Sequence, residues 1–320
     1  MAPSRGDGET APLDLLSYPS RLVQTLDAHQ APVNIVKYNH GAKYLLSGSA
    51  DRTIRLWNPS LGKEIKCYRG HAQEVLALDI AHDNAKFASS GGDRAVFVWD
   101  VPSGSVLRRC QGHFGKINAV AFSPDAQVLA SAGFDAKVML WDMRASSREA
   151  LQTLKEATST ITSLILPSSP QILTGSADGF LRTYDLRFGL LTDDLIGEPI
   201  TSLRLSPSAP EESILVGTAE DGKGKIRVMD RKDGSCLQTI SGFSTGVTGR
   251  AGLSWGYGEG CVLAGDDEGG LWSWNVLDAK PLASSPNKIH KRLITSIEIH
   301  PKGKEMITAS LDGTIKVWAK

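Results

Sequence analysis

Short runs of alternating apolar and polar residues recur along the chain, each bounded by turn-forming residues. The first such group covers residues 33–38, 44–48, 53–57 and 64–68, with Asn, His, Gly and Asp in the turns between the runs. Alternation of this kind predicts half-buried strands, so the group predicts four strands joined by tight turns. No stretch shows sustained helical periodicity. The pattern therefore predicts an all-β protein.

The four-strand unit repeats seven times. The segments LSGSADRTIRLWN, ASSGGDRAVFVWD, ASAGFDAKVMLWD and TASLDGTIKVWA are close copies, and residues 173–185, 215–230 and 263–275 are weaker ones. An aromatic residue or its substitute falls near the end of each copy, with steps of 42 to 45 residues, at Trp57, Trp99, Trp141, Tyr184, Met229, Trp274 and Trp318.

A period of this length, with Gly-His upstream and Trp-Asp downstream, resembles the WD-repeat family over residues 20–320. The resemblance implies a seven-bladed WD40 β-propeller in which each copy forms one blade.

The two ends of the chain predict how the ring closes. The last copy stops at Lys320 and holds only three strands. Residues 21–26 precede the first copy and read like the outer strands of other copies. We expect them to pair with the C-terminal blade as its outer strand, because a closed ring protects its strand edges. Residues 1–19 are predicted to be a flexible tail, and residues 20–320 one propeller domain.

Composition restricts the classes of function. The chain has 35 Lys plus Arg and 35 Asp plus Glu, so its formal net charge is zero. This argues against a protein held on nucleic acid mainly by phosphate contacts. The four cysteines form no CxxC pair, and no apolar run approaches the ~20 residues that span a bilayer. We expect a cytoplasmic and nuclear protein without membrane contact, metal or cofactor.

Four of the seven histidines lie 28 residues before the Trp of their copy. The family resemblance implies that each joins a buried hydrogen-bond network with a strand Ser or Thr, a turn Asp and the Trp. The predicted networks are His29, Ser47, Asp51 and Trp57; His71, Ser89, Asp93 and Trp99; His113, Ser131, Asp135 and Trp141; and His290, Thr308, Asp312 and Trp318.

These sets have the composition of a protease triad, but the repeat accounts for them as structural, and we expect no enzyme activity. Copies four to six lack the network. We expect their blades to be held mostly by apolar packing and to be the softer half of the ring.

The loops that carry these histidines and the turns that carry the Asp residues should share one face, which by resemblance is the usual docking face. Phe134 and Leu311 are apolar where a solvated turn would favour Gly, Asn or Asp, and Phe114 follows His113. Exposed aromatic anchors beside charge are typical of partner sites. Lys291 and Arg292 predict a basic rim, and Asp267 with its neighbours an acidic one. Each of these positions is equally compatible with an ordinary turn residue.

Some stretches resemble one branch of the family more closely. Residues 55–59, 91–104 and 184–189 are similar to the mitogen-activated protein kinase organizers, which are WD-repeat scaffolds. The similarity is good over residues 20–190 and weaker over blades five to seven. It implies a protein–protein interaction scaffold, monomeric within larger complexes, whose partners are kinase-cascade components or spliceosomal proteins.

A second class of function stays open. Residues 141–144 fit the pattern WDxR, and residues 184–187 fit it with Tyr for Trp. Consecutive copies of this pattern occur in substrate receptors of cullin-type ubiquitin ligases, where Arg144 and Arg187 would contact a ligase adaptor. Alternatively, each arginine pairs with a neighbouring turn carboxylate.

Overall fold

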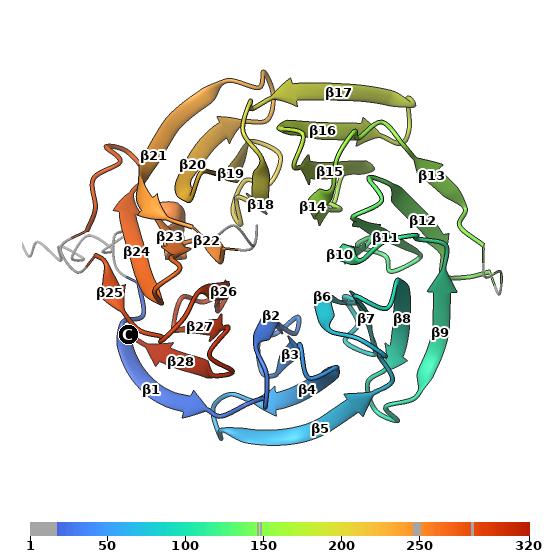
Figure 1. The fold of residues 1–320 in the computed structure, drawn as a ribbon, viewed down its shortest axis with the longest axis horizontal. Helices are drawn as coiled ribbons and strands as arrows, with labels where there is room; N and C mark the ends of the chain where they lie inside the picture. The colour runs from blue at the N-terminus through green and yellow to red at the C-terminus, as the bar shows by residue number, and fades with distance from the viewer. Residues whose placement is uncertain (1–17, 146, 148, 246–250, 283–284) are drawn as a thin grey trace, which may run out of the picture.

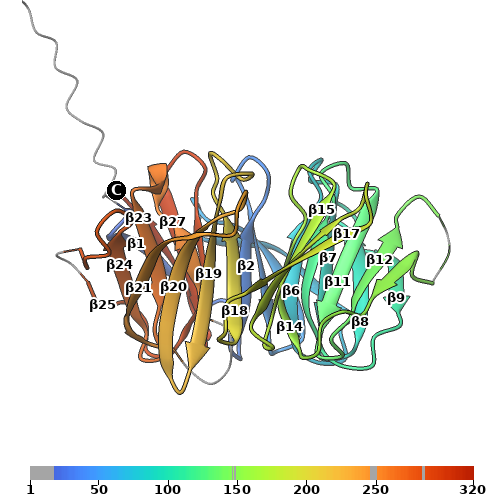
Figure 2. The same ribbon diagram turned by 90° about the horizontal axis from the view of Figure 1, so that it is seen from above.

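The computed structural model describes residues 18–145, 147, 149–245, 251–282 and 285–320, and shows seven four-stranded antiparallel sheets arranged as a closed ring (Figure 1). This confirms the predicted seven-bladed propeller. Figure 2 shows the blades standing side by side, with turns and loops gathered on the two faces of the ring.

In each of the first six blades the strands follow one another in chain order from the central channel outward. Blade one contains β2 (Val33–Tyr38), β3 (Leu45–Ser49), β4 (Thr53–Asn58) and β5 (Lys63–Arg69); blade two contains β6 (Val75–Ile80), β7 (Lys86–Gly91), β8 (Ala95–Asp100) and β9 (Val106–Gln111). Blade three contains β10 (Ile117–Phe122), β11 (Val128–Gly133), β12 (Val138–Asp142) and β13 (Gln152–Leu154).

Blades four to seven continue the pattern. Blade four contains β14 (Ile161–Ile165), β15 (Gln171–Ser176), β16 (Phe180–Asp185) and β17 (Leu190–Leu195); blade five contains β18 (Ile200–Leu205), β19 (Ser213–Glu220), β20 (Lys223–Asp230) and β21 (Cys236–Ser244). Blade six contains β22 (Leu253–Trp255), β23 (Cys261–Gly265), β24 (Gly270–Asn275) and β25 (Asn287–Lys288); blade seven contains β26 (Ile294–Ile299), β27 (Glu305–Ser310) and β28 (Ile315–Ala319).

The fourth strand of blade seven comes from the start of the chain. β1 (Arg21–Leu26) pairs antiparallel with β28, so the two ends of the described chain lie side by side (Figure 1). The predicted closure is therefore confirmed. Residues 1–17 of the predicted tail lie outside the described residues, whereas Tyr18 is buried against blades six and seven, with its hydroxyl 3.5 Å from Ser273 Oγ.

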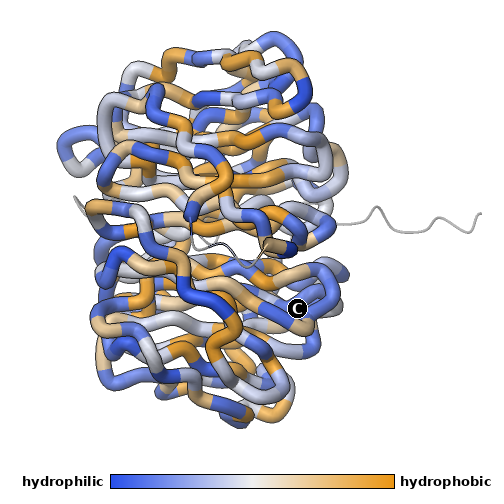
Figure 3. The backbone as a smooth tube through the Cα atoms, turned by 90° about the vertical axis from the view of Figure 1, so that its right-hand side faces the viewer, coloured by the Kyte–Doolittle hydropathy of each residue, from blue (hydrophilic) through white to orange (hydrophobic). Residues whose placement is uncertain are grey.

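The hydrophobic core consists of layers between neighbouring blades. One layer contains Leu46 and Ile54 from blade one together with Phe87 and Trp99 from blade two. Figure 3 shows apolar segments recurring along the strands from one end of the ring to the other. Each blade thus buries the faces of its sheet against both neighbours, which a single repeat could not do alone. Among the described residues, helical structure is limited to the 3₁₀ turn η1 (Tyr257–Glu259), far shorter than a membrane crossing requires.

Candidate functional site

Four blades contain the same buried chain of hydrogen bonds between a turn Asp and a Trp. In blade two, the Trp99 indole N–H donates to Ser89 Oγ at 2.7 Å, and Ser89 Oγ lies 2.7 Å from His71 Nε2. The other imidazole nitrogen, Nδ1, is 2.9 Å from Asp93 Oδ2. Corresponding distances of 2.8 to 3.0 Å join His29, Ser47, Asp51 and Trp57; His113, Ser131, Asp135 and Trp141; and His290, Thr308, Asp312 and Trp318.

The direction of the hydrogen bonds follows from the donors available. The indole N–H can only donate, so the hydroxyl accepts from Trp and donates its own hydrogen to Nε2, and Nδ1–H donates to the carboxylate. A neutral imidazole satisfies this chain. In blade seven, burial lowers the pKa of His290 despite the neighbouring Asp312, which favours that neutral form.

The turn carboxyl groups are held ionised by the same network. Burial acts to raise the pKa of Asp312, but hydrogen bonds from Thr314 and Lys291 outweigh it and lower that pKa to about 2. The pKa values of Asp51, Asp93 and Asp135 are lowered for the same reason, with the histidine as donor. Because the four hydroxyl groups are completely buried, no substrate can reach them, and the geometry is that of a structural tie between strand, loop and turn.

Blades four and six replace this network with other buried polar pairs. In blade four, Arg182 Nη1 lies 2.9 Å from Asp178 Oδ2, and both side chains are buried. In blade six, the Trp272 indole N–H donates to Asp266 Oδ2 at 2.9 Å. Thr174, at the strand position of the network hydroxyls, has no hydrogen-bond partner for its buried Oγ1 within the described part of the chain.

Blade five has a third arrangement, built around Glu198. The carboxylate accepts hydrogen bonds from Thr218 Oγ1 at 2.7 Å and from Arg227 Nη1 at 3.2 Å. Its second oxygen forms an ion pair with Lys225. Burial opposes ionisation, but these donors outweigh it and lower the pKa of Glu198 to about 2. Polar side chains thus supply ties in blades four to six in addition to the apolar packing expected there. That these blades form the softer half of the ring stays a prediction.

The face that carries the network histidines, called here the histidine face, presents two phenylalanines on blade three. Phe114 is 75% exposed and Phe134 67% exposed. The Phe114 backbone N–H donates to Asp135 Oδ2 at 3.1 Å, so the buried network fixes the loop that carries the ring. Lys137 Nζ lies 5.0 Å from the centre of the Phe114 ring. A Cβ on Gly115 would lie 2.9 Å from Phe134 Cβ, which shows how closely loop and turn approach.

The other residues predicted on the histidine face lie across the ring on blades six and seven (Figure 1). Lys291 and Arg292 are exposed, and Arg292 Nη1 is 3.5 Å from Leu311 O. Leu311 and Asp267 are half-buried. The structure does not bring this group together with Phe114 and Phe134.

The two arginines of the WDxR-like patterns lie after β12 and β16, on the face opposite the histidine face. Arg144 is exposed, and its Nε lies 3.2 Å from Asp142 Oδ1 of the same pattern. Arg187 is also exposed; its backbone N–H donates to Asp185 Oδ1 at 2.9 Å, and its side chain forms no ion pair with the described residues. Arg144 thus pairs within its own motif rather than with a neighbouring turn.

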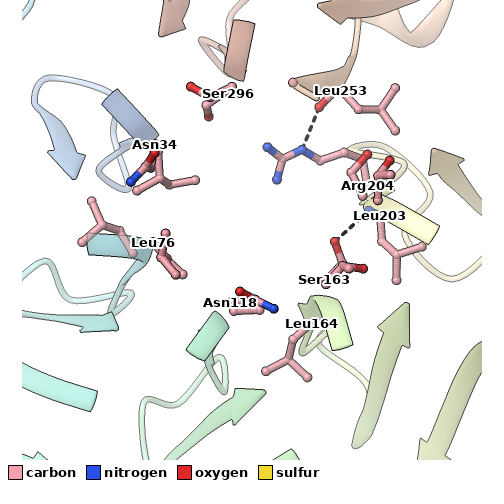
Figure 4. Close-up of a pocket in the computed structure, with 18 of the residues that line it drawn as sticks. Asn34, Leu76, Asn118, Ser163, Leu164, Leu203, Arg204, Leu253 and Ser296 are labelled. Carbon is pink, nitrogen blue, oxygen red and sulfur yellow. Dashed lines mark hydrogen bonds between the residues drawn. The ribbon is translucent and has the colours of Figure 1, made fainter. Parts of the chain in front are cut away.

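Hydrogen bonds of one kind near the central channel join neighbouring blades at four of the seven blade boundaries, and sequence reasoning missed them. In six of the seven blades the pairing of the first two strands skips the second residue of the inner strand. Figure 4 shows three of these skipped residues, Asn34, Leu76 and Asn118, at the channel wall. Side chains of four of them donate to a carbonyl at the start of the next inner strand: Asn34 to Val75 at 2.8 Å, Asn118 to Ile161 at 3.0 Å, Thr162 to Ile200 at 2.7 Å, and Thr295 to Val33 at 2.7 Å.

The channel encloses a cavity of about 150 Å³ whose charged groups pair with one another. Arg204 Nε donates to Leu253 O at 2.9 Å (Figure 4), and Arg204 Nη2 lies 3.3 Å from Glu298 Oε1. Lys37 forms an ion pair with Asp79. In the described part of the chain, no cluster of three or more His, Cys, Asp or Glu side chains could hold a metal ion. These pairs connect blades: Arg204 of blade five contacts blades six and seven, and Lys37 of blade one contacts blade two.

The ring of four-stranded blades and the repeated network define a WD-repeat propeller, a class whose members are generally non-enzymatic scaffolds for protein interactions. This chain belongs to the WD40 family: the family model "WD domain, G-beta repeat" matches residues 20–58, 62–100, 104–142, 148–185 and 284–319. These matches cover blades one to three, the first three strands of blade four, and blade seven.

Full-length relatives support the same assignment. The chain is 45% identical to an uncharacterized WD repeat-containing protein of Schizosaccharomyces pombe, over 90% of this chain and 94% of the relative. It is 42% identical to WD repeat domain-containing protein 83 of Rattus norvegicus, over 94% of this chain and 92% of the relative. The protein of that name from Homo sapiens is 39% identical over the same shares.

Proposed function

We propose that this chain is a scaffold that binds partner proteins on its histidine face, with Phe114 and Phe134 as the anchors. One observation carries the proposal: two large aromatic side chains stand exposed on a loop and a turn that a buried network holds in place. Aromatic side chains supply much of the binding energy at protein interfaces, and anchors that are already ordered lose little entropy on binding. Lys137 adds a positive charge beside them.

We further propose that the partners are kinase-cascade components, late-stage spliceosomal proteins, or both. The support is the similarity of residues 55–59, 91–104 and 184–189 to the mitogen-activated protein kinase organizers. A zero net charge favours protein partners over RNA. In this proposal the chain acts as a monomer within larger complexes in the cytoplasm and the nucleus, and a rigid ring that holds two partners raises their effective concentration toward each other.

Affinity purification tests both parts of the proposal. The double variant Phe114→Ala/Phe134→Ala is compared with the wild type, and captured proteins are scored as kinases or splicing factors. Loss of two such anchors is expected to weaken binding by about 2 kcal/mol or more, which is roughly thirtyfold. The control is Leu277→Ala, which removes an even more exposed apolar side chain from blade six. Equal capture by wild type and double variant would contradict the proposal.

A second candidate is a substrate receptor of a cullin-type ubiquitin ligase, favoured by the exposed side chain of Arg187, which forms no ion pair with the residues that the structure describes. A pull-down with the ligase adaptor compares the wild type with Arg144→Ala and Arg187→Ala. Capture that depends on Arg187 would support the receptor function. Absent capture, or capture that neither substitution affects, would discard it.

A further inference from the structure

Each blade of the ring ends in an outer strand, and six of the seven outer strands have an edge that opposes pairing with another chain. The outer strands β1, β5, β9 and β21 each contain a register shift against their neighbour. The outer strands β13 and β25 have only three and two residues. Bulges and short length are two ways in which sheets avoid adding a foreign strand at the edge.

The outer strand of blade four, β17, has neither protection. Its six residues pair with β16 residue for residue, from Asp185↔Leu190 to Phe180↔Leu195, without a register shift. It also contains no Lys or Arg, whereas β5 carries Lys63, Lys66 and Arg69 and β9 carries Arg108 and Arg109. Figure 1 shows β17 on the outside of the ring, with no other strand beyond it. β17 is thus a regular strand with an open edge.

The backbone of β17 has a defined set of groups that face outward. The Ile196 N–H donates to Gly179 O at 2.9 Å, and this pair continues the register of the ladder. Alternation in an antiparallel ladder then directs the N–H and C=O groups of residues 190, 192 and 194 toward β16. The outward groups are those of Leu191, Asp193 and Leu195.

Apolar side chains gather along the same segment. Five large apolar residues within ten positions are between 39 and 75% exposed: Leu186, Phe188, Leu190, Leu191 and Leu195. No other ten-residue stretch of the described chain exposes more than three such side chains. Exposed apolar surface next to unpaired backbone groups is the combination that strand addition uses, since main-chain hydrogen bonds give affinity and side chains give selectivity.

The charges on β17 restrict the kind of strand that fits. Asp193 and Asp194 are adjacent, and Asp193 Oδ1 lies 3.5 Å from Arg182 Nε. Burial and the charge of Asp193 raise the pKa of Asp194, which forms no ion pair within the described residues. A second copy of β17 placed against the edge would bring carboxylates together, and like charges on neighbouring strands are destabilising. A strand with basic side chains has the complementary charge.

We propose that the open edge of β17 binds an extended segment of a partner protein, with apolar residues alternating with Lys or Arg, as a fifth strand of blade four. This surface is separate from the phenylalanines of the histidine face. The proposal stands on the unshifted ladder, the exposed leucines and the acidic pair.

The test uses the full chain and two blocked eight-residue peptides, one alternating Val with Lys and one alternating Val with Glu. Fluorescence polarisation of labelled peptides should show saturable binding of the basic peptide and not of the acidic one. The variant Leu191→Lys/Leu195→Lys should weaken that binding about tenfold or more, because it removes apolar contacts and adds like charge. Val106→Lys/Leu107→Lys makes the same change on β9 and should bind as the wild type does.

Two further measurements separate strand pairing from simple charge attraction. A basic peptide N-methylated at every residue keeps its charge but loses the N–H donors of both strand edges, and it should not bind. Amide hydrogen exchange at Leu191, Asp193 and Leu195 should slow in the presence of the unmodified peptide. Equal binding of the methylated peptide, no binding of the basic peptide, or dimerisation of the free chain through this edge would each overturn the proposal. Circular dichroism confirms that each variant is folded.

Discussion

Two buried threonines at the same strand position offer a direct test of the network's role in stability. Thr308 in blade seven and Thr174 in blade four each precede the aromatic residue of their blade by ten positions. Thr308 Oγ1 accepts the Trp318 indole N–H at 3.0 Å and lies 2.8 Å from His290 Nε2. Thr174 Oγ1 has no partner among the described residues. The substitution Thr→Val removes the hydroxyl at either site while nearly keeping its shape.

The expected free-energy changes differ in size and in sign. Thr308→Val leaves the buried Trp318 N–H and His290 Nε2 without partners, and each orphaned group costs about 1–3 kcal/mol. We expect a loss of about 2–4 kcal/mol in the free energy of unfolding. Thr174→Val removes a hydroxyl that is buried without a hydrogen bond, so we expect no loss, or a gain of about 1 kcal/mol.

Urea unfolding followed by far-ultraviolet circular dichroism measures both changes without relying on tryptophan fluorescence. A shift in the midpoint at constant m reports the change in stability. A loss in Thr308→Val that is no larger than the loss in Thr174→Val would refute the view that these hydrogen bonds stabilise the blade.

Three other predictions concern different parts of the ring. The folded-state pKa values of His290 and Asp312 lie below their ordinary values of 6.5 and 3.8, so the unfolded chain binds protons more readily than the folded chain. The free energy of unfolding should therefore fall as the pH drops below about 6.5, because of His290, and again between about pH 4 and 2, because of Asp312. Urea midpoints at several pH values measure both drops, and the second should be smaller in Asp312→Asn. Deleting residues 1–27 removes β1 from the edge of β28 and should cost about 3 kcal/mol or more, and an unchanged melting temperature would contradict the role of β1 in closure. Asp178→Ala removes the nearer partner of the buried Arg182 and leaves only Asp193, whose Oδ1 lies 3.5 Å from Arg182 Nε; it should cost about 3 kcal/mol, much of which Asp178→Ala/Arg182→Leu should restore in the same unfolding assay.

The fold and the four networks could be predicted from the sequence because both depend on fixed spacing. In every complete copy the histidine lies 22 residues before its Asp and 18 before its hydroxyl residue, and the hydroxyl residue lies ten before the Trp. A repeated spacing identifies partners that are distant along the chain. The closing strand was recognisable for the same reason, since residues 21–26 match the outer strands of other copies.

The polar ties of blades four to six could not be predicted, because each occurs only once. Glu198 lies in the loop before β18, and its partners Lys225 and Arg227 lie on β20. The sequence between them contains several other charged residues, so only the folded backbone shows which ones meet. Arg182 occupies a position of β16 that alternation would assign to an ordinary strand residue, and its burial depends on Asp178 in the preceding turn.

The hydrogen bonds around the channel did leave a signal in the sequence. Five inner strands begin with Val or Ile followed by Asn or Thr, at residues 33–34, 117–118, 161–162, 200–201 and 294–295. The dipeptide alone is compatible with any strand. The Asn or Thr faces the next blade only because the strand pairing skips this residue. Such a skip is a property of two paired strands and cannot be read from one of them.

The two proposed partner surfaces differ in how far the sequence alone identifies them. Phe114 and Phe134 could be selected from the sequence because turn chemistry makes an exposed aromatic residue unusual at such positions. The open edge of β17 could be recognised only by comparing the pairing of all seven outer strands, because the sequence of β17 alone is that of an ordinary strand. Under the two proposals, a partner on the histidine face of blade three leaves the outer edge of blade four open, because the two surfaces face in different directions. Adjacent blades would then hold two partners at a fixed separation, and binding at one surface raises the local concentration for the other to about the millimolar range when a short flexible linker connects the ligands.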